Sequence, residues 1–273
     1  MEAKPLGRMP NAPLALVLAQ IRHSRYLTME KHLPALQDTV RHRYPAFRTS
    51  QIQSLELTGG PVNVQVGTRW EFADIENRRG FFLQQDSLVF LVTAYTDYED
   101  FAGRFAEILG HFEALVPDVL VERVGLRYVD LIVPQPGESP ERYVASGLHG
   151  FPLGALADKA KSLQAQCVSK CDFADQEGLL IARYSRGISD PYLPADLQPL
   201  TLALPEIVDR AKAKQGEAVI AMLDWDRIVP HRASFDRAAL IARFGAMHSD
   251  LGEAFKRATS EYGREVWNSR SAR

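Results

Sequence analysis

Glu122-Arg123-Val124-Gly125-Leu126-Arg127-Tyr128-Val129-Asp130 is the stretch that decides the fold. It is typical of a β-strand, in which successive side chains point to opposite faces. An earlier stretch, Ala19-Gln20-Ile21-Arg22-His23-Ser24, aligns with it so that Ile21-Arg22-His23 falls on Leu126-Arg127-Tyr128. Each stretch is followed by a helical pattern, several strand patterns and a long closing helix. The sequence therefore predicts two copies of one structural unit.

The first predicted unit covers residues 1–117 and begins with a loose leader at 1–13. An apolar strand from Leu14 precedes a helix over 27–44, since apolar residues recur there at three- and four-residue spacing. Strand patterns follow between 47 and 95. A wide apolar stripe at helical period then predicts a long helix that ends at Pro117.

The second predicted unit covers residues 118–273. Its strand patterns lie around 163–173, 179–184 and 218–223, and a last helix, capped by Ser234, repeats the apolar stripe. Both long helices carry an Arg-Phe pair early in the stripe, at Arg104-Phe105 and Arg243-Phe244.

The units differ by an insertion at about residues 186–216 in the second. An insertion of this length is either a lid or binding loop, or a decorated surface loop. Runs of strands flanked by helices predict an α+β fold, with each unit a curved antiparallel sheet packed on a long helix. By analogy this is a helix-grip or TATA-binding-protein-like arrangement, and the analogy carries no activity.

The composition is that of an ordinary globular protein. The chain has 273 residues, 46% of them hydrophobic and 24% charged, with a formal net charge of −2. This balance argues against a nucleic-acid binder. A polar N-terminal stretch, only two cysteines and no apolar run of about 18 residues predict a cytoplasmic protein without a membrane span. We expect a monomer or a homodimer.

Four landmarks occur in order along residues 11–267: Asn11-Ala12-Pro13-Leu14 with Gln20-Ile21, Thr68-Arg69-Trp70-Glu71-Phe72, Arg123-Val124-Gly125-Leu126-Arg127-Tyr128, and His248 with Phe255. In these the chain resembles a sporadically distributed bacterial family of uncharacterised proteins about 250 residues long. The Arg-x-Gly-Leu-Arg-Tyr run is the most specific landmark. The resemblance implies an accessory protein of a bacterial system and supplies no catalytic residue.

The sequence lacks the common signatures of cofactor and nucleotide sites. It contains no Gly-x-x-x-x-Gly-Lys-Ser/Thr or Gly-x-Gly-x-x-Gly run, no Gly-x-Ser-x-Gly elbow and no common zinc pattern. We therefore predict no cofactor. Cys167 and Cys171 lie on a strand, about 13 Å apart at ~3.3 Å per residue, and are predicted to be small core fillers.

Arginines give the first candidate site. Arg123, Gly125 and Arg127 fall on one face of their strand, and Arg22 matches Arg127 in the other unit. Arginine forks bind carboxylates and phosphates with two parallel hydrogen bonds. We therefore predict ligand-binding residues Arg22, Arg123, Arg127 and Tyr128 at the seam of the two units. The alternative is cross-strand pairing with a glutamate or an aspartate, for which Glu56 and Glu71 are candidates.

Asp224 and Asp226, with His231, give the second candidate site. Two carboxylates two residues apart at a strand end face the same way, and a histidine could join them to bind a metal or move a proton. The alternative is a strand terminus with solvated acids and a turn at Pro230.

The sequence as a whole favours a binding protein over an enzyme. The predicted function is non-enzymatic: an accessory protein that engages a protein partner or an anionic small molecule near the seam. The alternative is a metal-dependent enzyme, or an enzyme partner, that uses Asp224, Asp226 and His231.

Overall fold

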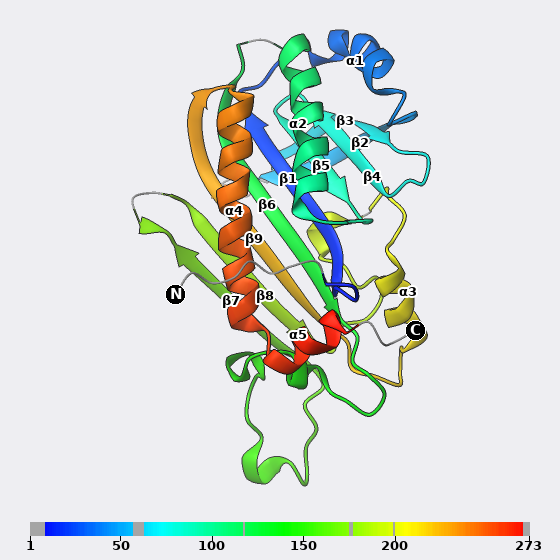
Figure 1. The fold of residues 1–273 in the computed structure, drawn as a ribbon, viewed down its shortest axis with the longest axis vertical. Coiled ribbons are helices and arrows are strands. Elements are labelled where there is room, and N and C mark those ends of the chain that lie inside the picture. Colours follow the sequence, from blue (N-terminus) through cyan, green and yellow to red (C-terminus); the bar gives the residue numbers. More distant parts are fainter. Residues whose placement is uncertain (1–8, 57–62, 117, 175–176, 199, 270–273) are drawn as a thin grey trace.

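The structure, a computed structural model, describes residues 9–56, 63–116, 118–174, 177–198 and 200–269. The described residues form one large antiparallel sheet of nine strands with helices on both faces (Figure 1). The predicted α+β class is therefore confirmed. None of the helices in these ranges combines the length and apolar character that crossing a bilayer requires.

The strand order is β2-β3-β4-β5-β1-β6-β9-β8-β7. The strands are β1 (Leu14–His23), β2 (Ala46–Glu56), β3 (Asn63–Ala73), β4 (Arg79–Gln84), β5 (Ser87–Val92), β6 (Leu120–Ile132), β7 (Ala165–Asp172), β8 (Leu179–Arg186) and β9 (Ala221–Ser234). The α-helices are α1 (Leu33–Val40), α2 (Tyr98–Leu115), α3 (Glu206–Ala213), α4 (Arg237–Ala258) and α5 (Glu261–Asn268). Short 3-10 helices cover Met29–His32, Pro140–Tyr143, Ser146–Leu148, Gly154–Leu156 and Ala195–Leu197.

The two stretches that align in the sequence are neighbours at the centre of the sheet. β1 and β6 pair antiparallel, with Ala19 opposite Leu126 and Arg22 opposite Arg123. β5 lies on the outer side of β1, and β9 lies on the outer side of β6. Each of these outer strands leads into a long helix, α2 or α4.

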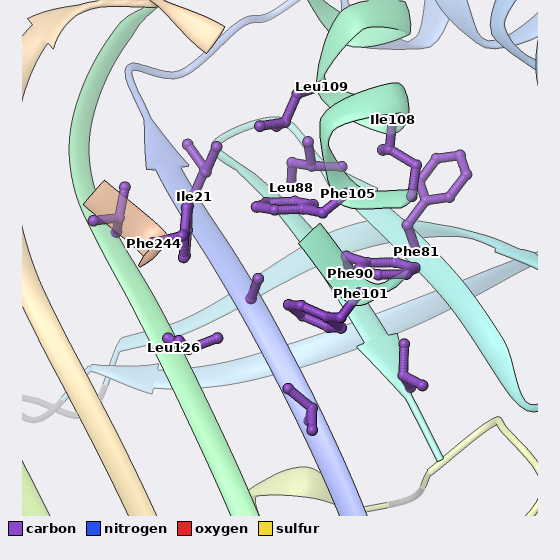
Figure 2. Packing of buried hydrophobic residues seen from close by; sticks show 14 of the residues in the cluster. Ile21, Phe81, Leu88, Phe90, Phe101, Phe105, Ile108, Leu109, Leu126 and Phe244 are labelled. Carbon is purple, nitrogen blue, oxygen red and sulfur yellow. The ribbon is translucent and has the colours of Figure 1, made fainter. Parts of the chain in front are cut away.

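Helices α2 and α4 lie side by side on one face of the sheet (Figure 1). Their apolar stripes are buried, and the rings of Phe105 and Phe244 meet edge to face with centroids 5.1 Å apart (Figure 2). The α4 cap differs from the prediction. β9 continues to Ser234, and Asp236 caps the helix by accepting a hydrogen bond from the Ala239 amide.

The inserted segment makes a second apolar layer on the opposite face of the sheet. Ile207, Val208 and Ala211 of α3 pack against Val129 and Leu131 of β6. The insertion is thus neither a free lid nor a simple surface decoration, because its apolar residues complete a core.

Two local predictions differ from the structure, and a third lies mostly outside the described residues. The helix expected over 27–44 is a 3-10 turn followed by the short α1, whose second residue is Pro34. Cys167 is half-buried, as a core filler would be, but Cys171 is exposed on edge strand β7. Most of the predicted leader, 1–8, and Pro117 lie outside the described residues.

Candidate functional site

Arg127 lies on the face of β6 that α3 covers farther along, and it is saturated by carboxylates. Its Nε and Nη2 donate to the two oxygens of Asp224 at 2.7 and 2.9 Å. Its Nη1 and Nη2 donate to Asp196, in the insertion, at 2.5 and 3.1 Å. The Arg127 guanidinium holds the pKa of Asp196 below its ordinary value. Arg127 is only 7% exposed, so its fork is committed within the protein.

Arg127 is paired with a carboxylate across the strands, as the alternative predicted, and its partner is an aspartate. Glu71 accepts hydrogen bonds from Arg69 and Ser50 instead, and the side chain of Glu56 lies outside the described part. The aspartate comes from β9, next to β6 on the side away from β1.

The three predicted arginines do not converge on one point. Arg22 is opposite Arg123 in the β1–β6 pair, whereas the β1 partner of Arg127 is Leu18. Arg22 forms an ion pair with Asp86 at 2.6 Å. Arg123 is exposed and makes no ion pair with any described residue. Burial and the neighbouring Arg22 lower its pKa. Because Arg123 and Arg127 are four residues apart on a strand, about 13 Å separates them. The predicted three-arginine cluster is therefore not assembled.

The second candidate set is not brought together either. Pro230 does not end the strand, and β9 continues past it to Ser234 with a shift in its register against β6. Asp226 and His231 are thus five residues apart on extended backbone, about 16 Å by the strand rise. Asp224 is held by Arg127 and also by Arg183, at 3.0 Å. Within the described ranges, no three His, Cys, Asp or Glu side chains are grouped so that they could hold a metal ion.

Tyr128, the remaining predicted residue, faces the other way and opens onto the main cavity. This cavity has a volume of about 920 Å³ and lies between the start of β1, strand β6, the N-terminal end of α2, and parts of α3 and α4. Both halves of the sequence contribute to its walls. Its aromatic lining is Tyr95, Tyr98, Tyr128, Trp225, His248 and Phe255.

Four of these rings form a linked group, which we call the stack: Tyr95, Tyr98, Tyr128 and His248. The ring of Tyr98, the first residue of α2, lies parallel to His248 of α4 with centroids 4.0 Å apart. The Tyr128 hydroxyl and His248 Nδ1 are within hydrogen-bonding distance at 3.0 Å. Tyr95, between β5 and α2, meets Tyr128 edge to face with centroids 6.0 Å apart. The stack therefore joins the two long helices to the central strand.

Asp130 is the buried charge of the cavity. It is 4% exposed, and its Oδ2 accepts a hydrogen bond from Trp225 Nε1 at 3.2 Å. The pKa of Asp130 is raised to about 7, mainly by burial and in smaller part by nearby Asp224, while the Trp225 hydrogen bond opposes the shift. Asp130 therefore changes charge near neutral pH, and it has no ion-pair partner among the residues that the structure describes.

The other titratable groups of the cavity interior are uncharged at neutral pH. Burial lowers the pKa of His248, which favours neutral imidazole. Burial raises the pKa of Tyr95 and of Tyr98 to about 12, and raises that of Tyr128 well above its ordinary value. The Tyr98 hydroxyl is buried without a hydrogen-bond partner. Asp130 is thus the group in this interior that can carry charge at pH 7.

Sequence reasoning identified Tyr128 but missed Asp130 and His248 as site residues. A signal for Asp130 was present, because period two from Val124 places it on the same face as Leu126 and Tyr128, a face that is otherwise apolar. A charged residue on an otherwise apolar strand face predicts a buried charge, which is a signal of a special role. His248 gave a weaker signal, since one histidine within a helical stripe is usually structural.

Comparisons with protein-family models, curated proteins and solved structures find no match for this chain.

Proposed function

We propose that this chain is a non-enzymatic binding protein whose small-molecule ligand occupies the cavity beneath α2 and α4. The cavity volume of about 920 Å³ falls within the range of small-molecule sites, about 300–1,000 Å³. Such sites combine aromatic walls with few polar groups that converge on the ligand. Here the polar groups are Asp130, His248 and the tyrosine hydroxyls.

One observation carries the proposal. Asp130 is a carboxyl buried in an aromatic cavity with no cation beside it in the described structure. Burying a charge without a partner destabilises a protein, so such groups are concentrated at functional sites.

The proposal moves the ligand away from the arginine face. Arg127 is occupied by Asp196 and Asp224, so binding an external anion there would require breaking buried ion pairs. Tyr128 keeps its predicted role in ligand binding, on the opposite face of β6.

The same proposal includes two related units, residues 1–117 and 118–273, with the ligand at their seam. The strand order supports it, because β1 and β6 start the two halves at the centre and β5 and β9 flank them. If the two units are related, equivalent ends of both would line the cavity.

Glycines provide a direct test of ligand binding in the cavity. Gly252 of α4 lines the cavity, and a Cβ built on it meets nothing within 4 Å. Gly252→Phe should therefore fill the space without disturbing the helix. Gly103→Phe on α2 is a matched control, because Gly103 is also helical and unobstructed but exposed.

Native mass spectrometry of the protein from its native host is the measurement. We expect a small molecule to co-purify with wild type and with Gly103→Phe, and to be absent from Gly252→Phe. A ligand retained equally by both variants would remove the cavity from the proposal.

A protein partner is a second candidate, favoured by exposed apolar side chains on edge strand β7 and in the segment that precedes it. These are Phe151, Leu156, Leu163 and Val168, the last being 66% exposed on β7 itself. Exposed strand edges pair readily with other chains. The partner that can be tested directly is a second copy of the chain. Sedimentation over a concentration series should show dimers that Val168→Lys abolishes, and a monomer throughout would exclude self-association at this edge.

A further inference from the structure

We propose that the cavity binds an organic cation, an ammonium or protonated nitrogen base, with its charged nitrogen against Asp130. This inference rests on the proposed ligand-binding function and names the chemical class of the ligand. It follows from the distribution of charge, the ring geometry and a contrast with a second buried aspartate.

The charged side chains of the cavity differ in burial: most are exposed to solvent, and Asp130 is buried. The side chains that line it and can carry charge, apart from Asp130 and His248, are Arg78, Asp97, Glu99, Glu206, Arg210, Glu253 and Lys256. All of these are partly or fully exposed, so water and salt screen them. Asp130 is the buried member of the set, and in its charged form it attracts a cation into the interior.

The rings around Asp130 suit a cation. Tyr95 and Tyr128 lie at 78° to each other in edge-to-face contact, so their ring faces point in different directions. The faces of aromatic rings attract cations, and cages of such rings are a known mode of ammonium recognition. Trp225, the strongest ring type for this interaction, hydrogen bonds to Asp130 itself.

The contrast is with Asp224, which is also buried, on the neighbouring strand β9. Asp224 is neutralised by Arg127 and Arg183. Asp130 receives an indole N–H where Asp224 receives two guanidinium groups. The cation that would neutralise Asp130 is therefore supplied by the ligand.

Choline and its uncharged isostere 3,3-dimethyl-1-butanol are the probes, because they differ in charge but hardly in shape. We expect calorimetry to show choline binding at least tenfold more tightly than the isostere. Asp130→Asn should lose at least tenfold in choline affinity without changing affinity for the isostere. Asp226→Asn is the matched control, since Asp226 is on β9 outside the cavity lining.

The pH dependence gives a second readout. Choline keeps its charge at every pH, so its affinity should rise between about pH 6 and 8 as Asp130 loses its proton. His248 acts in the same direction, because its protonation at lower pH would repel a cation. Trp225 and Asp224 are the other groups that act on Asp130. The part of the pH dependence that disappears in Asp130→Asn belongs to Asp130.

The outcomes separate this inference from the function it rests on. Equal affinities for the two probes, or full choline binding by Asp130→Asn, would overturn the cation inference and leave the binding function in place. If neither probe binds while Gly252→Phe still excludes a co-purified molecule, the inference again fails alone. If Gly252→Phe excludes nothing and neither probe binds, both are wrong.

Discussion

Asp130 and Asp224 are carboxylates buried to a similar degree, 4% and 1% exposed, on adjacent strands of one sheet. They face opposite sides and have opposite surroundings. Asp224 lies among arginines on the face that the insertion covers, whereas Asp130 lies among aromatic rings on the face that α2 and α4 cover. A buried charge with its counter-charge present is a structural element, and one without it marks a place where something else binds.

The largest expected effect is at the neutralised aspartate. Asp224→Asn leaves Arg127 and Arg183 without their buried charge partner, and removing one member of a buried pair typically destabilises by about 3–5 kcal/mol. Urea denaturation at pH 7, followed by circular dichroism, measures the change in the free energy of unfolding. Asp226→Asn, two residues along the same face, is the control and should change it little. An Asp224→Asn variant as stable as wild type would show that the ion-pair network is not structural.

At Asp130, substitution by asparagine is expected to stabilise the protein instead of destabilising it. The pKa of Asp130 is raised in the folded protein to about 7 from an ordinary value of 3.8. Its contribution to stability is therefore fully present below about pH 4 and is lost as pH rises through about 7. Asp130→Asn keeps an oxygen that can accept from Trp225 and removes the charge. We expect this variant to be more stable than wild type by about 1–3 kcal/mol at pH 8 and nearly equal to it at pH 4.

Denaturation of wild type and Asp130→Asn at both pH values tests the comparison between the two aspartates. Loss of stability at pH 8 in the variant would mean that the carboxylate is stabilised within the fold. Asp130 would then be a structural group like Asp224, and the contrast would disappear. A gain in stability together with weaker choline binding is the trade-off expected of a functional group.

Much of the fold could be predicted because it depends on local patterns. Alternation identified β6, and the apolar stripes identified α2 and α4. These patterns are visible in the sequence because each element buries one face, so its apolar residues recur at a regular spacing. Boundaries were harder to predict, as β9 shows: a single Pro230 suggested a turn, yet β9 continues past it. Pro230 lies where the β6–β9 register shifts and where β8 no longer pairs with β9, which are the places where a strand tolerates proline.

The candidate site was harder to predict because it depends on which residues are opposite each other across strands. Alternation placed Arg127 on the correct face but could not reveal that β9 would bring Asp224 to it. The insertion, which supplies Asp196, gave no sequence signal of pairing with Arg127. Partners separated by about 70–100 residues in sequence are set by the sheet order, and the sheet order is not a local property.

The smallest change in the free energy of unfolding is expected at Arg123. Arg123 shares a strand face with Arg127, so the two arginines can be compared as the two aspartates are. Arg123 is exposed, has no described ion-pair partner, and lies opposite the like-charged Arg22. Arg123→Ala should change the free energy of unfolding by no more than about 0.5 kcal/mol, and relief of repulsion could make the change stabilising. Arg127→Ala removes the ion pair with Asp196 and leaves buried Asp224 with Arg183 alone, and should lose about 3–5 kcal/mol.

Paired melting curves of the two arginine variants decide between the structural and the ligand-binding view of this face. The sequence alone predicted that Arg127 binds an anionic ligand, whereas the ion pairs of Arg127 give it a structural role. A native-like melting temperature for Arg127→Ala, together with loss of an anionic ligand in both variants, would return the binding site to the arginine face. Arg127→Ala melting far below an unaffected Arg123→Ala would leave the cavity around Asp130 as the site.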